Sequence, residues 1–216
     1  MFIGHFAMGL GAKKLAPAVS LGTLFLAAQF VDLLWPTLLL LGVEKVAISP
    51  GITKFTPLDF SHYPISHSLL TSIAYSILFG ALFYLVRRNW KGAIVVGACV
   101  LSHWMLDLIT HRPDLPLGLG STTHVGLGLW NSFPGTLIVE VGLFVIAIVL
   151  YTRATIAKNK RGVIGFWGLI IFLSLIYIGN IVGPLPPDVK SLAIAGHSQW
   201  ILVIWAYWLD RHRQNS

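Results

Sequence analysis

Six apolar runs divide the chain, and each is long enough to cross a bilayer as a helix. A helix rises about 1.5 Å per residue, so roughly 20 residues span about 30 Å of hydrocarbon. The chain is 56% hydrophobic and only 11% charged, well below the charge of a typical soluble domain. We therefore expect an all-α integral membrane protein that forms a single polytopic domain over residues 1–216. The predicted spans are 19–41, 65–86, 92–110, 134–151, 163–182 and 191–209.

The N-terminal segment 1–12 is also apolar, but at roughly 18 Å it is too short to span. It lacks the basic region of a cleaved signal peptide, so we expect a short re-entrant or interfacial helix. If Lys13 and Lys14 mark the membrane surface, His5 lies roughly 13 Å inward, at the depth expected for His103.

Lys and Arg residues are distributed unevenly between the two sides of the predicted membrane. Eleven of the 15 lie on the side of both termini, which places both termini in the cytoplasm. The net charge of +7 comes from short loops between apolar runs, so it indicates topology rather than nucleic-acid binding. The single cysteine, Cys99, lies inside an apolar run and excludes both a disulfide framework and a thiolate metal site.

The third span carries a pattern that needs a chemical explanation. Residues 101–111 place His103, Asp107 and His111 at successive four-residue steps, which puts them on one face of a helix. An ionisable side chain at mid-bilayer depth costs about 2.5 to 3.5 kcal/mol, so several together imply a compensating partner. A divalent metal ion, most simply zinc, suits neutral imidazole and carboxylate ligands.

Polar residues of other spans fall near the same depth, counted along alternating helices. This convergence does not depend on which side of the membrane is outside. The alternative for each histidine taken singly is a hydrogen bond between helices. Histidines with independent structural roles would lie at unrelated depths in the membrane, so we predict a shared metal site. The residues that meet in or near the outer half are Asp32, His67, His103, Asp107, His111 and Glu140.

The roles expected of these residues differ. Asp32 has no basic partner nearby in sequence, which suits a ligand or a general base. Ser66 and Ser68 flank His67 at a predicted helix start, where their hydroxyl groups can orient ligands. Glu140 fits either support of a ligand or helix packing. His124 and His197 have no partner at ligand spacing and are expected to be structural or surface groups.

Four stretches together resemble a known family. They are Gly4-His5, Asp32 in the first span, His62-Tyr-Pro-Ile-Ser-His67-Ser68, and Leu101-Ser-His103 with Asp107 and Thr110. They resemble the bacterial family of LexA-binding, inner-membrane-associated metal-dependent hydrolases, over roughly residues 1–114. The chain is more loosely similar to zinc-dependent bacterial phospholipase C, whose metal ligands include a His-x3-Asp helix. The resemblance implies a bacterial inner-membrane location, a metal site within residues 1–130 and a place for His62 near it.

The chain departs from the family pattern at two positions. Family members often carry Asp-x-Asp where this chain reads Asp32-Leu-Leu, so a carboxylate for a second metal is missing. His111 stands where the family pattern usually lacks a histidine, and it and Glu140 are the candidates to replace that carboxylate. The role of the spans in 131–216 is not assigned by the resemblance.

These observations predict a membrane-embedded hydrolase that uses metal-activated water on a lipid or lipid-linked phosphoester. Asp32, His67, His103 and Asp107 are the expected ligands, with Asp32 or Asp107 free to act as base. His5 and His111 are possible additional ligands. Arg112, the only arginine on the outer side, is expected to neutralise phosphate oxygens. The alternative is that Arg112 pairs with Asp114 or extends to lipid headgroups.

Two other function classes remain open. A transporter or proton-coupled permease would use the same buried groups to relay protons or bind an ion. The first and last three spans show no inverted repeat, which argues against it. A non-catalytic regulator is suggested by the family label alone.

Overall fold

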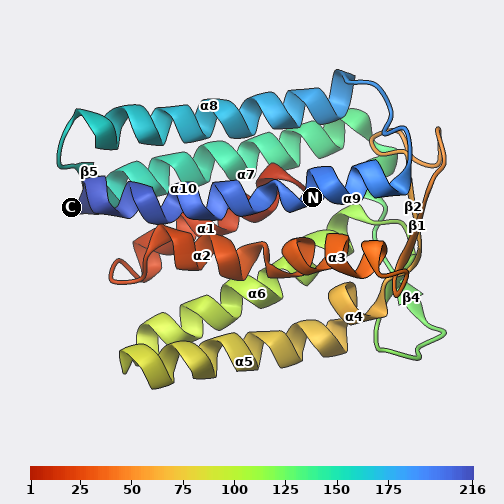
Figure 1. Ribbon diagram of the computed structural model, residues 1–216, viewed down its shortest axis with the longest axis horizontal. Helices are drawn as coiled ribbons and strands as arrows, with labels where there is room; N and C mark the ends of the chain where they lie inside the picture. Colours follow the sequence, from red (N-terminus) through yellow and green to blue (C-terminus); the bar gives the residue numbers. More distant parts are fainter.

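The computed structural model describes residues 1–216 and is predominantly helical (Figure 1). Long helices run side by side, and short two-stranded ribbons join them at both ends. The all-helical class expected for the chain is therefore confirmed. The helices are α1 (Ile3–Leu15), α2 (Leu21–Ala28), α3 (Phe30–Leu40), α4 (Pro64–His67), α5 (Leu69–Arg87), α6 (Trp90–Thr110), α7 (Phe133–Ala154), α8 (Lys160–Val182), α9 (Val189–His197) and α10 (Gln199–His212).

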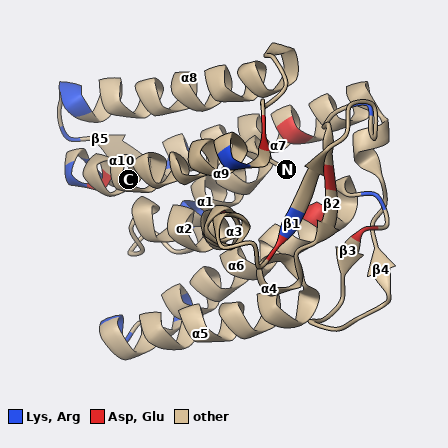
Figure 2. Ribbon diagram, turned by 45° about the vertical axis from the view of Figure 1, so that its right-hand side comes forward, with Lys and Arg blue, Asp and Glu red and all other residues tan.

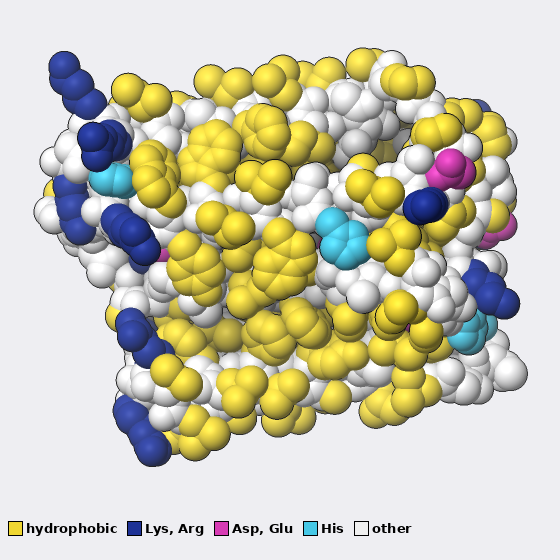
Figure 3. Space-filling view, viewed as in Figure 1, with side chains coloured by type: hydrophobic (Ala, Val, Ile, Leu, Met, Phe, Trp, Pro, Cys, Tyr) yellow, Lys and Arg dark blue, Asp and Glu magenta, His cyan; other side chains and the backbone are white.

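Five segments are long and apolar enough to cross a membrane, and a sixth results if the bent pair α2–α3 is one span. Four of them are the helices α5, α6, α7 and α8, and the fifth runs over α9 and α10. Apolar side chains cover the middle of the helices, while Lys and Arg gather at one end (Figure 3). These features support a multi-pass membrane protein.

The run at 19–41 is not the single helix that its length predicts. It forms α2 and α3, which are bent by 52° at Gln29. The carbonyl of Ala28 accepts a hydrogen bond from His103 Nδ1 at 2.7 Å, whereas a continuous helix would need it for the amide of Asp32. A contact with α6 thus replaces a helical hydrogen bond at the bend and brings the start of α3 beside α6.

Two further predicted spans are interrupted as well. The run at 65–86 begins with the one-turn helix α4, and the extended backbone of Ser68 separates it from α5. The Ser68 hydroxyl then caps α5 by accepting the amide of Thr71 at 3.2 Å. The run at 191–209 is divided at Ser198 between α9 and α10.

Helix α1 is packed inside the helical bundle. Its 13 residues measure about 20 Å, which is too short to cross the hydrocarbon. Phe6 and Leu10 have no exposed surface and belong to the largest apolar core, with side chains of α7, α8 and α10. A short helix enclosed by protein favours the re-entrant alternative over the interfacial one.

The ribbons cover the two ends of the bundle. Two of the three ribbons lie at the end of the bundle where α3 and α6 end. The other ribbon lies at the opposite end, where the C-terminus meets the segment before α8 (Figure 1). A Gly-rich loop that begins at Leu117 connects the two strands of the second ribbon. The strands are β1 (Lys45–Ile48) with β2 (Leu58–His62), β3 (Leu115–Pro116) with β4 (His124–Val125), and β5 (Thr155–Ala157) with β6 (Arg213–Asn215), all antiparallel, and a 3-10 turn (Leu129–Asn131) precedes α7.

Close packing of α5 on α6 depends on a glycine. The Ser76 hydroxyl donates to the carbonyl of Gly97 at 2.8 Å across the two helices. A Cβ added at Gly97 would lie 2.9 Å from the Ser76 carbonyl oxygen, closer than a backbone contact allows. Since α6 carries His103 and Asp107 while α5 follows His67, this contact fixes the relative position of both halves of the candidate site.

Candidate metal centre

Four side chains from three helices direct their ligand atoms toward one another. Asp32 comes from α3, His67 from α4, and His103 with Asp107 from α6. His67 Nε2 lies 3.3 Å from Asp32 Oδ1 and 3.9 Å from Asp107 Oδ2. His103 Nε2 lies 3.6 Å from Asp32 Oδ1 and 3.2 Å from Asp107 Oδ2. We call this set the four-residue ring.

Four separations around the four-residue ring are close to those expected between the ligands of a small divalent cation. A tetrahedral ion with bonds of roughly 2.0 to 2.1 Å has its ligand atoms about 3.3 Å apart. The four separations given above run from 3.2 to 3.9 Å around a closed circuit. The nitrogen atoms of His67 and His103 and the Asp32 oxygen also lie within 4.8 Å of one another. The buried His and Asp groups can therefore hold a metal ion.

Charge points to the same conclusion. No Lys or Arg forms an ion pair with Asp32 or Asp107, although Asp107 is only 1% exposed. Burial makes each charged carboxylate costly unless a cation accompanies it. The Met1 ammonium group, 2.8 Å from Asp107 Oδ1, offsets one of the two negative charges. With both imidazoles neutral, a net negative charge remains at the ring, and a bound cation would offset it.

The tautomer of His103 follows from its backbone contact. Nδ1 must carry the proton, because it donates to the Ala28 carbonyl at 2.7 Å. Nε2 is then a lone-pair donor to metals, and it is buried with no hydrogen bond in the structure. The bend between α2 and α3 therefore orients a metal ligand, since it frees the carbonyl that fixes this ring.

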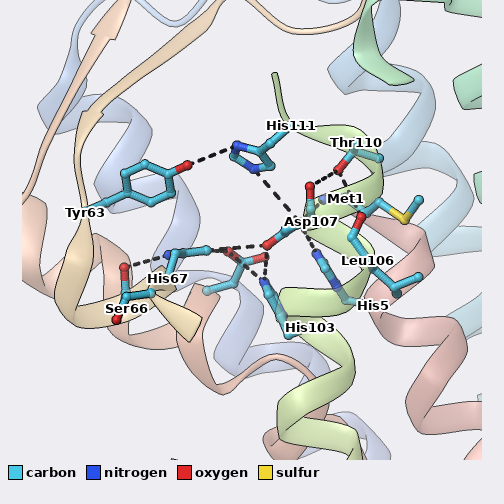
Figure 4. Close-up of polar contacts among 12 residues, drawn as sticks. Met1, His5, Tyr63, Ser66, His67, His103, Leu106, Asp107, Thr110 and His111 are labelled. Carbon is cyan, nitrogen blue, oxygen red and sulfur yellow. Dashed lines mark hydrogen bonds and ion pairs between the residues drawn. The ribbon is translucent and has the colours of Figure 1, made fainter. Parts of the chain in front are cut away.

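His67 is oriented by a chain of two further groups, and Figure 4 shows the first contact, between His67 and Ser66. Ser66 Oγ donates to Glu44 Oε2 at 2.6 Å, so its oxygen accepts from His67 Nδ1, also at 2.6 Å. The amides of Ile65 and Ser66 each donate to Glu44 Oε1 at 2.8 Å and hold that carboxylate in place. This arrangement leaves His67 Nε2 free for a metal, as a carboxylate–serine–histidine chain would require.

The position of Ser66 next to His67 in the sequence indicates its supporting role, whereas nothing in the sequence indicates that of Glu44. Glu44 follows α3 and precedes Lys45, so in the sequence it resembles an ordinary exposed loop charge. In the structure it is 2% exposed. Only the return of the chain through β1 and β2 brings it to α4, and no local signal in the sequence indicates that contact.

The other oxygen of Asp107 has a separate set of partners. Asp107 Oδ1 accepts from the α-amino group of Met1 at 2.8 Å and lies 3.1 Å from His5 Nε2. The His5 ring stacks on His103, with centroids 3.5 Å apart and planes 5° from parallel. The predicted reach of His5 to the depth of His103 is thus confirmed. His5, His103 and Asp107 form a second group with metal-binding geometry.

The two groups compete for one nitrogen. His103 Nδ1 is engaged by Ala28, so His103 can offer only Nε2, either to the four-residue ring or to the group that contains His5. His5 and the Met1 amine instead contact Asp107 Oδ1, the oxygen that does not face the four-residue ring. We therefore place His5 beside the ring rather than in it.

His111 faces Asp107 Oδ1 with Nε2 and belongs, through Nδ1, to a polar network with Tyr63 and Asp114. His111 Nδ1 lies 2.9 Å from Asp114 Oδ1, and Tyr63 donates to the same oxygen at 3.1 Å. Burial, followed by the nearby Asp114 carboxylate, raises the pKa of Tyr63 well above its usual range, so its hydroxyl stays a donor. His111 Nε2 lies 4.0 Å from Asp107 Oδ1, too far for a direct hydrogen bond.

Arg112 does not point its charge at the four-residue ring. Its Nη2 pairs with Asp59 of β2, and its Nε donates to Asp114 Oδ2 at 3.0 Å. Because Asp114 also binds His111, Arg112 connects β2 to the edge of the site. These two contacts use Nε and Nη2, so Nη1 is the part of the guanidinium group with no partner in the structure.

The remaining candidates take supporting or unrelated positions. Glu140 of α7 accepts the amides of Phe2 and Gly4 at 3.0 and 3.4 Å and so caps α1, which carries His5. Ser68 caps α5 instead of binding His67, and His62 is exposed at the end of β2. His124 is exposed, as expected for a surface group.

Asp32 is the most accessible member of the ring. Its side chain is 21% exposed, against 5% or less for His67, His103 and Asp107. Any ligand that reaches the ring without displacing helices must therefore approach along Asp32 and the start of α3.

Comparisons with family models, curated proteins and solved structures gave no match to this chain. The resemblance to the inner-membrane hydrolases stays a prediction that rests on the motif residues alone.

Proposed function

We propose that this chain is a membrane-embedded, metal-dependent hydrolase that acts on a lipid or lipid-linked phosphoester. The observation that carries the proposal is the closed ring of Asp32, His67, His103 and Asp107, with both histidine tautomers set by neighbouring groups. A divalent ion held there would lower the pKa of a water molecule from about 15.7 to about 7 and polarise the ester. Zinc is the ion we propose, because it accepts both imidazole and carboxylate ligands.

The two carboxylates of the ring are suited to different tasks. Asp107 is buried and held by the Met1 amine and His5, so it stays in place as a ligand. Asp32 is partly exposed and has no contact besides the two ring histidines. Catalytic zinc sites use three protein ligands and keep one position open. Asp32 is therefore the group that turns away and accepts a proton from the attacking water.

The position of the ring supports a lipid substrate. The partly exposed Asp32 lies in the first turn of α3, within a segment apolar enough to be part of a membrane span. A substrate that enters from the bilayer would meet Asp32 before the buried ligands. We place the site in the inner membrane of a bacterium, with both termini cytoplasmic, on the motif resemblance and the Lys and Arg distribution.

The test combines metal content with hydrolysis. Purified full-length chain in nanodiscs is assayed against phospholipid, lipid pyrophosphate and acyl-ester substrates before and after metal removal by a chelator. We expect hydrolysis of a phosphoester that is lost on chelation and restored by zinc. His67→Ala should abolish it, whereas His124→Ala, which removes an exposed histidine, should not.

Two results would contradict the proposal. Chelation that leaves hydrolysis unchanged would exclude a metal-dependent reaction. Flux of an ion or solute across liposomes that depends on Asp32 and Asp107, without cleavage of any substrate, would indicate the transporter class instead.

A further inference from the structure

A polar cavity of about 290 Å³ lies at the end of the bundle away from the metal centre. It is formed where α1, α5 and α10 end and where β5 meets β6. Figure 2 shows Lys and Arg gathered at this end of the helices. Four cationic side chains line the cavity against the single carboxylate of Asp210, and they are Lys13, Arg87, Lys158 and Arg213.

Two of the cations are built into the wall. Lys13 is only 6% exposed, and its Nζ donates to the Val19 carbonyl at 2.7 Å and lies 3.5 Å from Asp210. Arg213 donates from Nε, Nη1 and Nη2 to oxygen atoms of Thr155 and Gly162. These bonds use three of its five N–H groups and hold the guanidinium plane in one orientation. Residues that serve only as topology signals need no such fixed positions.

The other two cations are free to bind a ligand. Arg87 at the end of α5 and Lys158 before α8 are both exposed. Neither forms an ion pair or a side-chain hydrogen bond in the structure. They lie on opposite elements of one cavity that already has an excess of positive charge, so an anion with several oxygens would be bound from both sides.

A second cavity indicates which anion. It measures about 300 Å³, shares Ala18 and Arg87 with the first, and is also lined by Phe83, Val86 and Asn89. Beside it, the end of α5 exposes the apolar side chains of Leu82, Leu85 and Val86. A basic cavity that continues into a mixed one and onto an apolar helix face matches a lipid, with its phosphate in the first cavity, its glycerol region in the second and its acyl chains along α5. A free phosphate would occupy only the first cavity and would leave the second one empty.

We propose that the cavity between Lys13, Arg87, Lys158 and Arg213 binds the phosphate headgroup of an anionic phospholipid. This site is separate from the metal centre, because Arg87 is at the far end of α5 from His67, about 28 Å along the 19-residue helix. The proposal does not depend on the hydrolase function. Binding of the lipid at this position would tie the ends of α1, α5 and α10 together.

The experiment measures lipid binding to the full-length chain by native mass spectrometry, with phosphatidylglycerol and phosphatidylcholine as probes. The variant Arg87→Gln/Lys158→Gln removes the two free cations. The control Arg88→Gln/Lys160→Gln removes two exposed cations of the same end that do not line the cavity. Each cation near an anionic headgroup strengthens binding several-fold, so we expect about a 30-fold loss for the cavity variant. The control should stay within about twofold of wild type.

Three outcomes would overturn the proposal. Equal losses in both double variants would indicate diffuse attraction by the basic end rather than a site. Equal binding of phosphatidylglycerol and phosphatidylcholine in the wild type would remove the requirement for an anionic lipid. Inorganic phosphate or glycerol phosphate that displaces the lipid at matched concentration would assign the cavity to a soluble phosphate compound.

Discussion

Ser66→Ala should weaken metal binding although Ser66 is not itself a metal ligand. The Ser66 hydroxyl joins His67 Nδ1 to Glu44, with both contacts at 2.6 Å. Without it, His67 loses the acceptor that fixes its ring and keeps Nε2 free for the metal. Loss of such a supporting partner typically costs 10- to 100-fold in metal affinity, which is about 1.4 to 2.7 kcal/mol. The fold should survive, because two backbone amides still hold Glu44.

Ser68→Ala is the matched control, because Ser68 flanks His67 on its other side. Its hydroxyl accepts the amide of Thr71 and caps α5, so its loss should cost about 1 kcal/mol of stability without changing metal affinity. The assay is zinc competition against a chromophoric chelator, together with thermal unfolding of each variant. Metal affinity in Ser66→Ala within about twofold of wild type, or an equal loss in Ser68→Ala, would refute the role of Glu44 and Ser66.

Three further predictions concern substrate, packing and topology. Arg112→Lys should lower hydrolysis of all substrates alike, because lysine cannot bind Asp59 and Asp114 with one planar group; a loss confined to phosphate substrates would instead show direct phosphate contact. Gly97→Val should lower stability by about 1 to 3 kcal/mol in thermal or detergent unfolding, whereas Gly142→Val, whose added Cβ meets no atom, should not, and equal effects would contradict the packing. In a Cys99→Ala chain, Leu119→Cys should react only with external thiol reagents and Arg88→Cys only with cytoplasmic ones, and the reverse labelling would place the metal site on the cytoplasmic side.

The long spans could be predicted because apolar length alone determines them. The runs at 92–110, 134–151 and 163–182 each form one helix, extended by a few residues at the ends. The breaks at Gln29 and Ser198 have no such signal. The first break is associated with His103, 75 residues away from Ala28, which takes a carbonyl that the helix would otherwise use. Tertiary contacts of this kind do not appear in a local pattern.

The candidate ligands could be proposed for a similar reason. Helical spacing puts His103 and Asp107 on one face, and alternation of spans brings Asp32 and His67 to their depth. Which oxygen each histidine faces depends on side-chain rotation, so the separation of His5 from the four-residue ring could not be predicted. For Arg112, the neighbouring Asp114 was a foreseeable partner, but Asp59 was not, because it lies in a ribbon formed 53 residues earlier.

The most direct measurement of the metal centre is zinc X-ray absorption on purified, folded chain loaded to saturation. The four-residue ring predicts one tightly bound ion per chain, with two imidazole nitrogens and carboxylate oxygen at about 2.0 to 2.2 Å. His103→Ala should abolish tight binding while the thermal transition of the protein persists. A wild-type chain that folds but retains no ion, or a His103→Ala chain with an unchanged zinc spectrum, would contradict the site.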